Sequence, residues 1–346
     1  MIRVGIIGCG KITEERHAPE YFENPNGELA GFYDRTRGRA EALARQYGGR
    51  VYDTPEDLFA DPGIDAVSVC TANFLHAEMT VRALRAGKHV LCEKPMAVSA
   101  GECEEMIRAS KEAGRVLMIA QNLRFRRAHQ KAKELIAEGA VGRVLTFRTA
   151  LCHSGPESRS AEKGRHAWFF DPNAAVLGAL GDLGIHKADL IQYILGTEIV
   201  RTTARLATLD KRNDAGDPIG VDDNAICIFE MSDGVIGSMT ASWTHYGAHD
   251  SSTAVYGTEG ELRIFDDPAH ELVLLRRNEA PQYLDEPQPR RRDGRMNSGV
   301  IDAFLDCIVR GTEPEVSGES ALSAMRAIFA SAESAKTART VEVPRA

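Results

Sequence analysis

The chain has 346 residues, of which 43% are hydrophobic and 27% are charged, and its formal net charge is -8. This length is long for one compact domain and sufficient for two domains that each bury a core. The acidic balance argues against nucleic acid as a main partner, because a phosphate backbone requires a basic face. It leaves room for a local basic pocket that binds a phosphate group.

Seven cysteines occur singly, with no Cys-x-x-Cys pair, at Cys9, Cys70, Cys92, Cys103, Cys152, Cys227 and Cys307. Most lie in apolar runs, where a reduced cysteine behaves as a small hydrophobic residue. This pattern favours a reducing compartment, so we expect a cytoplasmic protein. The N-terminus shows no charged leader with a long apolar core, and no apolar stretch approaches the roughly 20 residues that span a bilayer. We therefore expect no signal peptide and no membrane partner.

The first third of the chain alternates short β-branched runs with helical patterns. The predicted strands are Arg3–Ile7, Leu29–Tyr33, Ala66–Cys70, His89–Cys92 and Val116–Ala120, and the predicted helices are roughly Ile12–Asn24, Thr36–Tyr47, Pro55–Phe59, Ala77–Ala86 and Ser99–Ala113. Strand–helix alternation with nearly continuous apolar strands is typical of a parallel sheet covered by helices on both faces.

The pattern changes after about Asn122. Short turns now join consecutive strand-like runs, which predicts an antiparallel sheet. The predicted strands are Arg143–Leu151, Val200–Leu209, Asn224–Met231, Val235–Thr244, Ser252–Gly257, Glu261–Phe265 and Glu271–Leu275. The predicted helices are Ala128–Glu138, Asp182–Leu195, Val300–Arg310 and Ser317–Thr337, with exposed loops at His153–Arg165 and Asn278–Arg295.

The first predicted strand runs directly into Gly8, Cys9, Gly10, Lys11 and Ile12 and then into a helix. A tight glycine turn brings backbone N–H groups against a pyrophosphate at the N-terminus of a helix. Thr13 stands at the third glycine position of this fingerprint, so an ordinary glycine-rich turn stays open as the alternative.

A carboxylate ends the second predicted strand, 24 positions after Gly10, at Asp34. It can accept hydrogen bonds from the adenosine ribose and repels a 2′-phosphate, which favours NAD. Arg35 and Arg37 leave NADP open, since either can pair with that phosphate. We therefore predict an α/β protein with a Rossmann dinucleotide-binding domain over residues 1–122. A C-terminal α+β domain over residues 123–346 follows, and its last helix can pack back on the first domain.

The turns after the later strands of the first domain hold further candidates for cofactor binding. Ligands of an open parallel sheet lie beyond the carboxyl ends of its strands. Asn73 and His76 can instead cap a helix. Lys94 can hydrogen-bond a substrate oxygen beside the nicotinamide, with a surface ion pair as the alternative. The Lys94–Pro95 bond can be cis or trans. The cofactor-binding candidates in these turns are Thr71, Ala72, Asn73, His76, Glu93, Lys94 and Gln121.

A glycine-rich segment leads into a helix that carries Asp182 and His186. At this spacing both side chains lie on one helix face. A carboxylate beside an imidazole orients the ring and keeps its proton affinity suited to a general base. Two alternatives stay open: a core histidine beside a capping aspartate, and a metal site that takes further ligands from His153, His166 or Glu157. We expect no metal, because hydride transfer to a nicotinamide does not require one.

Three signatures occur in order: Gly8-x-Gly10 with Asp34, then Glu93-Lys94-Pro95, then Asp182-x-x-x-His186. Together they resemble the glucose–fructose oxidoreductase, inositol dehydrogenase and rhizopine-catabolism (Gfo/Idh/MocA) family of NAD(P)-dependent oxidoreductases. The resemblance covers nearly the whole chain, including the segments 256–260 and 316–319.

The resemblance implies hydride transfer between a nicotinamide cofactor and a secondary hydroxyl of a sugar or cyclic polyol. It implies that Lys94 lies beside the reacting hydroxyl, that His186 is the general acid/base and that Asp182 orients His186 and contacts the substrate. It also implies a large open C-terminal sheet that forms homodimers or homotetramers. The chain departs from the family at Thr13, at Ala72 and at Val176-Leu177-Gly178. The last departure puts the substrate class in doubt.

The loop His153–Arg165, with Trp168 and Phe169 behind it, is predicted to form a wall of the substrate pocket. Aromatic faces suit the C–H surfaces of sugars, and Arg124, His153 and Trp168 are candidates for substrate contact. A purely structural loop is the alternative. Two other functions stay open: a dinucleotide-binding sensor without chemistry, and a redox-neutral enzyme that uses tightly bound NAD.

Overall fold

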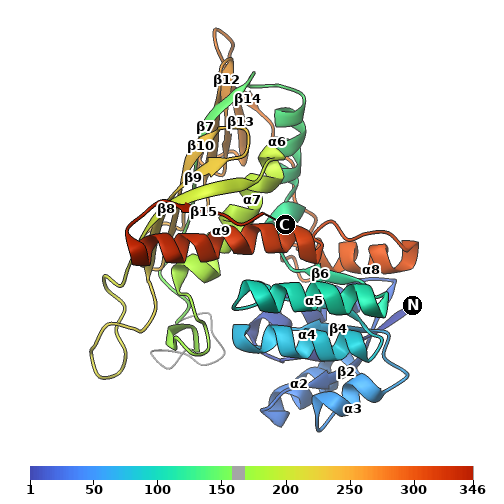
Figure 1. Cartoon of the computed structure of the whole chain (residues 1–346). Helices are drawn as coiled ribbons and strands as arrows, with labels where there is room; N and C mark the ends of the chain where they lie inside the picture. Colours follow the sequence, from blue (N-terminus) through green and yellow to red (C-terminus); the bar gives the residue numbers. More distant parts are fainter. Residues whose placement is uncertain (158–167, 346) are drawn as a thin grey trace. The chain divides into compact units, whose positions relative to one another are not determined.

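The computed structural model describes residues 1–157 and 168–345 (Figure 1). The described chain forms two compact units. The first comprises residues 1–122 and 289–322, and the second comprises residues 123–157, 168–288 and 323–345. Residues 289–322, which the sequence placed in the second domain, thus group with the first unit.

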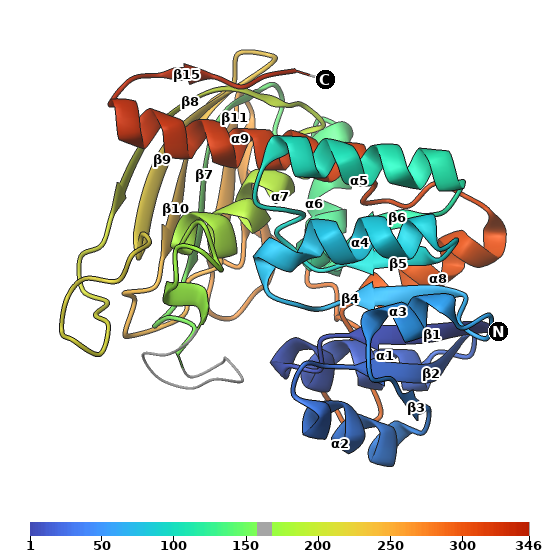
Figure 2. The same cartoon turned by 60° about the horizontal axis from the view of Figure 1, so that its bottom comes forward.

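The first unit contains a parallel sheet whose described strands follow the order β3-β2-β1-β4-β5-β6. Helices α4 and α5 lie side by side against strands of this sheet (Figures 1 and 2). The strand order reverses between β1 and β4, which is where folds of this kind bind a dinucleotide. The strands are β1 (Ile2–Ile7), β2 (Gly27–Tyr33), β3 (Arg50–Val51), β4 (Ala66–Val69), β5 (His89–Cys92) and β6 (Leu117–Ile119). The helices are α1 (Ala18–Glu23), α2 (Arg37–Tyr47), α3 (Pro55–Ala60), α4 (His76–Arg85), α5 (Ala100–Ala113) and α8 (Val300–Arg310).

Side-chain caps determine where two of these helices begin. Thr54 accepts a hydrogen bond from the Asp57 N–H at 3.1 Å, and Pro55 occupies the first turn of α3. Ser99 accepts a hydrogen bond from the Glu102 N–H at 3.2 Å and caps α5. The predicted strands and helices of this unit are all present, nearly at their predicted bounds. The two-residue strand β3 is too short for a hydrophobic pattern to reveal.

The second unit contains a larger sheet whose described strands follow the order β14-β13-β12-β11-β7-β10-β9-β8-β15. Neighbouring strands are antiparallel except for β7 and β10, which are parallel. The predicted fold class, a Rossmann domain followed by a mostly antiparallel sheet, is confirmed. The strands are β7 (Val144–Cys152), β8 (Ile199–Ala207), β9 (Asn224–Met231), β10 (Ile236–Ser242), β11 (Thr253–Gly257), β12 (Gly260–Ile264), β13 (Leu272–Arg276), β14 (Gln282–Tyr283) and β15 (Val341–Glu342).

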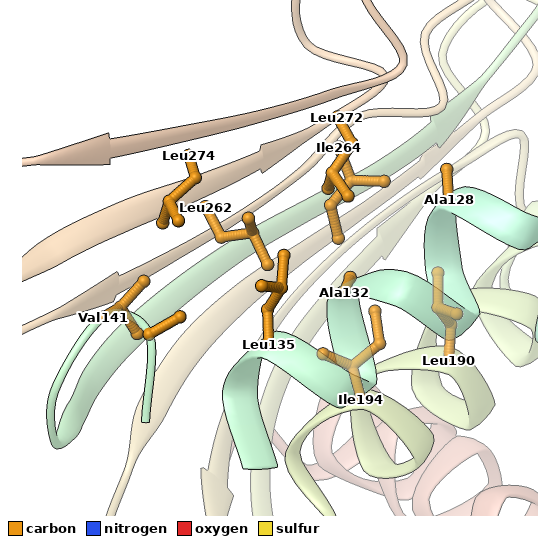
Figure 3. Close-up of a cluster of buried hydrophobic side chains, with 11 residues drawn as sticks. Ala128, Ala132, Leu135, Val141, Leu190, Ile194, Leu262, Ile264, Leu272 and Leu274 are labelled. Atoms are coloured by element: carbon orange, nitrogen blue, oxygen red, sulfur yellow. The ribbon is translucent and has the colours of Figure 1, made fainter. Parts of the chain in front are cut away.

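The core of the second unit lies between this sheet and two helices, α6 (Arg127–Ala137) and α7 (Ile185–Leu195). Figure 3 shows Leu135 of α6 and Ile194 of α7 beside strand residues such as Leu262. These side chains are almost completely buried. The cluster fixes the two helices on the sheet and so positions the N-terminal turns of α7. A third helix, α9 (Gly318–Thr337), begins in the first unit and continues in the second.

Two predicted helices contain a π-helical segment that the sequence did not reveal. One is η1 (Thr13–His17), which precedes α1, and the other is η6 (Leu180–Gly184), which precedes α7. Such segments are frequent at functional sites. Here one follows the glycine turn and the other carries Asp182.

All seven cysteines are buried. In the part of the chain that the structure describes, no helix combines the length and the apolar character needed to cross a membrane.

Candidate active site

The glycine turn after β1 has the backbone conformation of a dinucleotide-binding loop. Gly8 has a φ of 92°, and a Cβ atom there would lie 2.4 Å from the carbonyl oxygen of Cys70, so only glycine fits. Around Gly10, in contrast, a Cβ atom would meet no described atom within 4 Å. The space beside Gly10 is thus open to a phosphate that approaches the backbone.

Thr13, the departure from the glycine fingerprint, has its own structural role. Its side chain is fully buried, and its hydroxyl donates a hydrogen bond to the carbonyl oxygen of Gly8 at 2.6 Å. This bond ties η1 to the glycine turn. The side chain therefore supports the loop without the close helix–strand approach that a third glycine permits.

The carboxylate of Asp34 closes the same turn. Oδ2 accepts the Cys9 N–H at 2.7 Å, and Oδ1 accepts the N–H two residues downstream of Asp34, also at 2.7 Å. Since a carboxylate offers about four lone-pair sites, acceptor capacity remains for ribose hydroxyls. Arg37 pairs with two carboxylates, Glu41 and Asp53. Its position therefore does not favour the predicted alternative in which Arg37 binds a 2′-phosphate.

His76 joins the turns that follow β4 and β5. Its Nδ1 lies 2.7 Å from the carbonyl oxygen of Pro95, and its Nε2 lies 3.1 Å from that of Thr71. Burial lowers the pKa of His76, so the ring is neutral and its one N–H favours the shorter contact. A ring enclosed between two turns supports them, and a direct contact of His76 with the cofactor stays a prediction. The Lys94–Pro95 peptide bond is cis.

Glu93 holds the backbone of Lys94 and is itself held by His17 of η1. Glu93 Oε2 accepts the Lys94 N–H at 3.1 Å, and Oε1 lies 2.9 Å from His17 Nε2. Burial alone would lower the pKa of His17, but Cys70 and Glu93 raise it to about 10. Burial alone would raise the pKa of Glu93, but His17 lowers it to about 2. The two side chains therefore form a buried ion pair.

Gln121 follows β6. Because β5 and β6 are parallel, Gln121 and the turn after β5 lie at the same end of the sheet, beyond the carboxyl ends of the strands. Its side chain is 1% exposed, and its Oε1 has no hydrogen-bond partner among the described residues. A buried amide oxygen without a partner is costly unless a ligand donates to it. Together with the open space at Gly10 and the remaining acceptor sites of Asp34, this shows that the residues present fit a nicotinamide dinucleotide.

In the second unit, the glycine-rich turn before η6 wraps around Asp222. The Asp222 carboxylate accepts the N–H groups of Gly178 at 2.9 Å and Leu180 at 2.8 Å. A Cβ atom at Gly178 would lie 1.7 Å from the Asp222 carbonyl oxygen, so glycine is required there. Burial raises the pKa of Asp222 to about 6. This contact determines where η6 begins.

Asp182 and His186 lie four residues apart on the continuous helix formed by η6 and α7, and both side chains are half-buried. Asp182 Oδ2 accepts a hydrogen bond from the indole Nε1 of Trp243 at 3.2 Å. Trp243 follows β10 and is fully buried. The sheet of this unit thus fixes the carboxylate that precedes His186.

Aromatic side chains surround Trp243. Trp168 and Phe169 stack with their ring centroids 3.9 Å apart. Phe169 and Phe170 each contact Trp243 edge-on, at 6.4 and 5.9 Å between centroids. Trp168 and Phe169 are only partly buried. These aromatic rings therefore belong to the same side-chain cluster as Asp182, and their contact with a sugar stays a prediction.

The other predicted substrate and metal ligands have different surroundings. His153 is buried, and its Nδ1 accepts the Gly155 N–H at 2.9 Å. Glu157 pairs with Lys211 at 2.7 Å, and His166 lies outside the described residues, as does most of the predicted loop. Among the described residues, no group of three or more His, Cys, Asp or Glu side chains is arranged to hold a metal ion.

Arg124, a predicted substrate contact, forms a buried ion pair instead. Its Nε lies 2.8 Å from Asp189 Oδ2, and its Nη2 lies 2.5 Å from Asp189 Oδ1. Both side chains are nearly inaccessible to solvent. A two-pronged pair of this kind fixes the start of α6 to α7. We therefore correct the prediction: the contacts of Arg124 give it a structural role.

The sequence did not predict three residues that support the cofactor-binding turns and the Asp182–His186 helix. His17 pairs with a residue 76 positions away, and no local pattern indicates such a contact. Asp222 is one of two adjacent aspartates before a strand. Such a pair indicates a turn, but it does not indicate which backbone N–H groups the Asp222 carboxylate accepts. Trp243 is one of only two tryptophans in the chain, and this rarity was the one available signal.

Comparison with protein-family models gives two matches. Residues 2–121 match the model described as "Oxidoreductase family, NAD-binding Rossmann fold", and residues 129–263 match the "GFO/IDH/MocA C-terminal domain". The two matches together cover most of the chain.

Known proteins of similar sequence and structure span the full length of the chain. A myo-inositol 2-dehydrogenase of Thermotoga maritima is 27% identical over 99% of this chain and 98% of its own length. The crystal structure of an aldose-aldose oxidoreductase from Caulobacter crescentus is 30% identical, with a TM-score of 0.84 and 99% coverage of both chains. A levoglucosan dehydrogenase in complex with NADH and levoglucosan is 27% identical, with a TM-score of 0.86 and full coverage of both chains.

Proposed function

Because the chain belongs to the Gfo/Idh/MocA family of oxidoreductases with an NAD-binding Rossmann fold, we propose that it transfers hydride between NAD and a secondary hydroxyl of a sugar or cyclic polyol. Relatives named for inositol and levoglucosan support this substrate class. The observation that carries the proposal is the pair Asp182 and His186 on one helix, with Trp243 fixing the carboxylate beside partly exposed aromatic rings.

The cofactor would be held by the first unit. The pyrophosphate would bind the N–H groups of the turn from Gly8 to Ile12, and Asp34 would accept hydrogen bonds from the adenosine ribose. Gln121 would accept a hydrogen bond at its buried Oε1. The remaining contacts come from the turns at Thr71–Asn73 and Glu93–Lys94. We expect NAD in preference to NADP, with Arg35 as the residue that would meet a 2′-phosphate. Bound NAD supplies an acceptor for the hydride that leaves the carbon.

We assign the proton chemistry to His186, Asp182 and Lys94. His186 takes the proton of the reacting hydroxyl as a general base and returns it in the reverse direction. Asp182 orients the imidazole and stabilises its protonated form, and its own direction is fixed by Trp243. Lys94 donates a hydrogen bond to the oxygen on which negative charge develops. Glu93 holds the Lys94 backbone for this contact.

The substrate would contact the aromatic side chains beside Asp182. Trp168 and Phe169 offer ring faces that suit the C–H surface of a sugar. His153 is a candidate for a hydroxyl contact through Nε2, because its Nδ1 already accepts the Gly155 N–H. Arg124 is left out of this set because it pairs with Asp189.

A substrate screen tests the proposed function. The purified protein is incubated with inositols, aldoses and sugar phosphates, with NAD and separately with NADP, and the reduced nicotinamide is followed by absorbance. We expect NADH to accumulate with at least one polyol or sugar. Substrate conversion without accumulation of NADH indicates a redox-neutral enzyme, and binding of NADH without conversion of any compound indicates a sensor; either result overturns the proposal.

We propose that two copies associate through the sheet of the second unit. Along β9, residues alternate between the buried Cys227 and Phe229 and the exposed Ile226 and Ile228. Ile236 of β10 is exposed on the adjacent strand. An exposed apolar patch of this kind is typical of a subunit interface. Ile228→Lys should shift a dimer or tetramer toward monomer in light scattering after gel filtration, whereas a monomeric wild-type protein would overturn the proposal.

We also propose a cytoplasmic location. The seven cysteines are buried singly among apolar residues, which suits a reducing compartment. Cell fractionation of the producing organism, with antibodies to this chain, should find it with the cytoplasmic proteins; recovery from the periplasm or the culture medium would contradict this location.

A further inference from the structure

His17 is a buried titratable residue to which the proposed chemistry assigns no role. It is the last residue of η1, the helical segment that directly follows the glycine turn. Its side chain is 1% exposed, and that of its partner Glu93 is 9% exposed. A charged pair this deeply buried costs desolvation free energy that only good geometry and further hydrogen bonds offset.

Both side chains have those further contacts. His17 Nδ1 lies 3.3 Å from the Ser68 hydroxyl on β4, while Nε2 lies 2.9 Å from Glu93 Oε1. The second oxygen of Glu93 accepts the backbone N–H of Lys94 at 3.1 Å. A continuous chain of hydrogen bonds therefore runs from the helix after the glycine turn to the backbone of Lys94.

On the other side of Lys94, the carbonyl oxygen of Pro95 meets His76 Nδ1 at 2.7 Å. The Lys94–Pro95 turn is thus held at the preceding carboxylate and at the following carbonyl group. Of these two supports, only the His17–Glu93 pair connects the Lys94–Pro95 turn to η1, the helical segment after the glycine turn.

We infer that His17 is a positioning residue that acts through Glu93 to fix Lys94 for hydride-transfer chemistry, so that the segment bound to the cofactor phosphates and the lysine that meets the substrate oxygen are one rigid assembly. The cationic ring balances the buried Glu93 carboxylate, and without it the carboxylate must move, take up a proton or admit water. Movement of the carboxylate or entry of water releases the Lys94 N–H, and a protonated carboxyl group accepts it more weakly. The inference rests on the proposed role of Lys94.

A double-mutant cycle between His17 and Lys94 tests this inference. His17→Gln keeps a hydrogen-bond donor but removes the positive charge, and Lys94→Ala removes the ammonium group. We expect Lys94→Ala to lower kcat by ~10²-fold, and His17→Gln to lower kcat by roughly tenfold with the KM of the polyol and the Kd of NADH within about threefold of wild type. The double variant should be no slower than Lys94→Ala alone, because His17 acts only through the lysine.

Tyr21→Phe is the matched control. Tyr21 lies one turn further along, on α1, is fully buried and bonds the same Ser68 hydroxyl at 2.8 Å, but makes no hydrogen bond to Glu93. This variant should keep kcat within about twofold of wild type while losing some thermal stability. If His17→Gln does not fold, Glu93→Met carries the same cycle, since it removes the carboxylate that accepts the Lys94 N–H.

The possible failures are distinguishable. Wild-type kcat in Lys94→Ala overturns the proposed role of the lysine and the inference with it. A slow Lys94→Ala together with an unchanged His17→Gln overturns the inference and leaves the proposed function standing. The same holds if the effects of the two substitutions multiply in the double variant, or if His17→Gln acts only by weakening NADH binding.

Discussion

The indole nitrogen of Trp243 donates a hydrogen bond to Asp182 Oδ2 at 3.2 Å, in a cluster of aromatic rings built by Phe169 and Phe170. Trp243 is fully buried, so its N–H has no competing water. A fixed donor of this kind limits the directions that a carboxylate can adopt. The sheet, through one side chain, therefore orients the acid that stands four residues before His186.

Trp243→Phe should lower kcat/KM by roughly tenfold, since it removes a hydrogen bond to a charged group but keeps an aromatic ring in place. Steady-state kinetics with the substrate found in the screen measures this effect. Phe229→Leu, a change in a fully buried ring of β9, is the control: it should lower thermal stability and leave kcat within about twofold. Equal kinetic losses in the two variants would show that the indole N–H has no specific role.

The stability of the protein should depend on pH through Asp222. Burial raises the pKa of its carboxyl to about 6 in the folded state, whereas an unfolded aspartate titrates near about 4. The folded state therefore binds the proton more tightly, and the resulting stabilisation is fully present below about pH 4 and lost as the pH rises through about 6. Relative to Asp222→Asn, the wild-type free energy of unfolding should fall by on the order of 2–3 kcal/mol across this window. Urea unfolding of both proteins at several pH values measures this difference. If the free energies of unfolding of wild type and Asp222→Asn change with pH in the same way, the prediction is wrong.

His76→Leu should weaken NADH binding several-fold and destabilise the first unit by about 1–3 kcal/mol, because it leaves the buried carbonyl group of Pro95 without its donor. Fluorescence titration with NADH and thermal unfolding measure the two effects. His89→Leu is the matched control at the opposite end of β5, where the ring accepts the Val116 N–H. It should reduce stability alone. A loss of NADH affinity in His89→Leu equal to that in His76→Leu would contradict the supporting role.

Arg124→Met should destabilise the protein by about 3–5 kcal/mol, since it leaves the buried carboxylate of Asp189 uncompensated. The double change Arg124→Met with Asp189→Leu should recover most of that loss, because it removes both charges together. In the double variant the KM of the sugar or polyol should match that of wild type. If a stable double variant shows a KM raised tenfold or more, the structural assignment is wrong and Arg124 contacts the substrate.

Much of the fold was predictable because hydrophobic pattern and turn chemistry agree locally. Strand β5 begins and ends at the predicted residues, and caps such as Thr54 with Pro55 place helix starts correctly. The strands β3, β14 and β15 were missed since each has only two residues. The π segments at η1 and η6 were also missed, because their residues show an ordinary helical pattern.

For the functional residues, predictability depended on whether the interacting residues are close together in the sequence. Glycine turns and the Glu93-Lys94-Pro95 motif are contiguous, so the sequence displays them directly. Partners that come together only in the folded chain are hidden: His17 with Glu93, and Trp243 with Asp182. For the same reason Arg124 was given to the substrate, because nothing near it in the sequence indicates Asp189, which lies 65 positions away.

The most direct test of Lys94 and His186 as catalytic residues is a single-turnover measurement with substrate that carries deuterium on the carbon bearing the reacting hydroxyl. We expect wild type to transfer the deuterium to NAD, and Lys94→Ala and His186→Ala to do so ~10²-fold more slowly with NADH affinity within about threefold of wild type. Transfer at the wild-type rate by either variant, or consumption of substrate with no deuterium on the cofactor, would contradict this assignment.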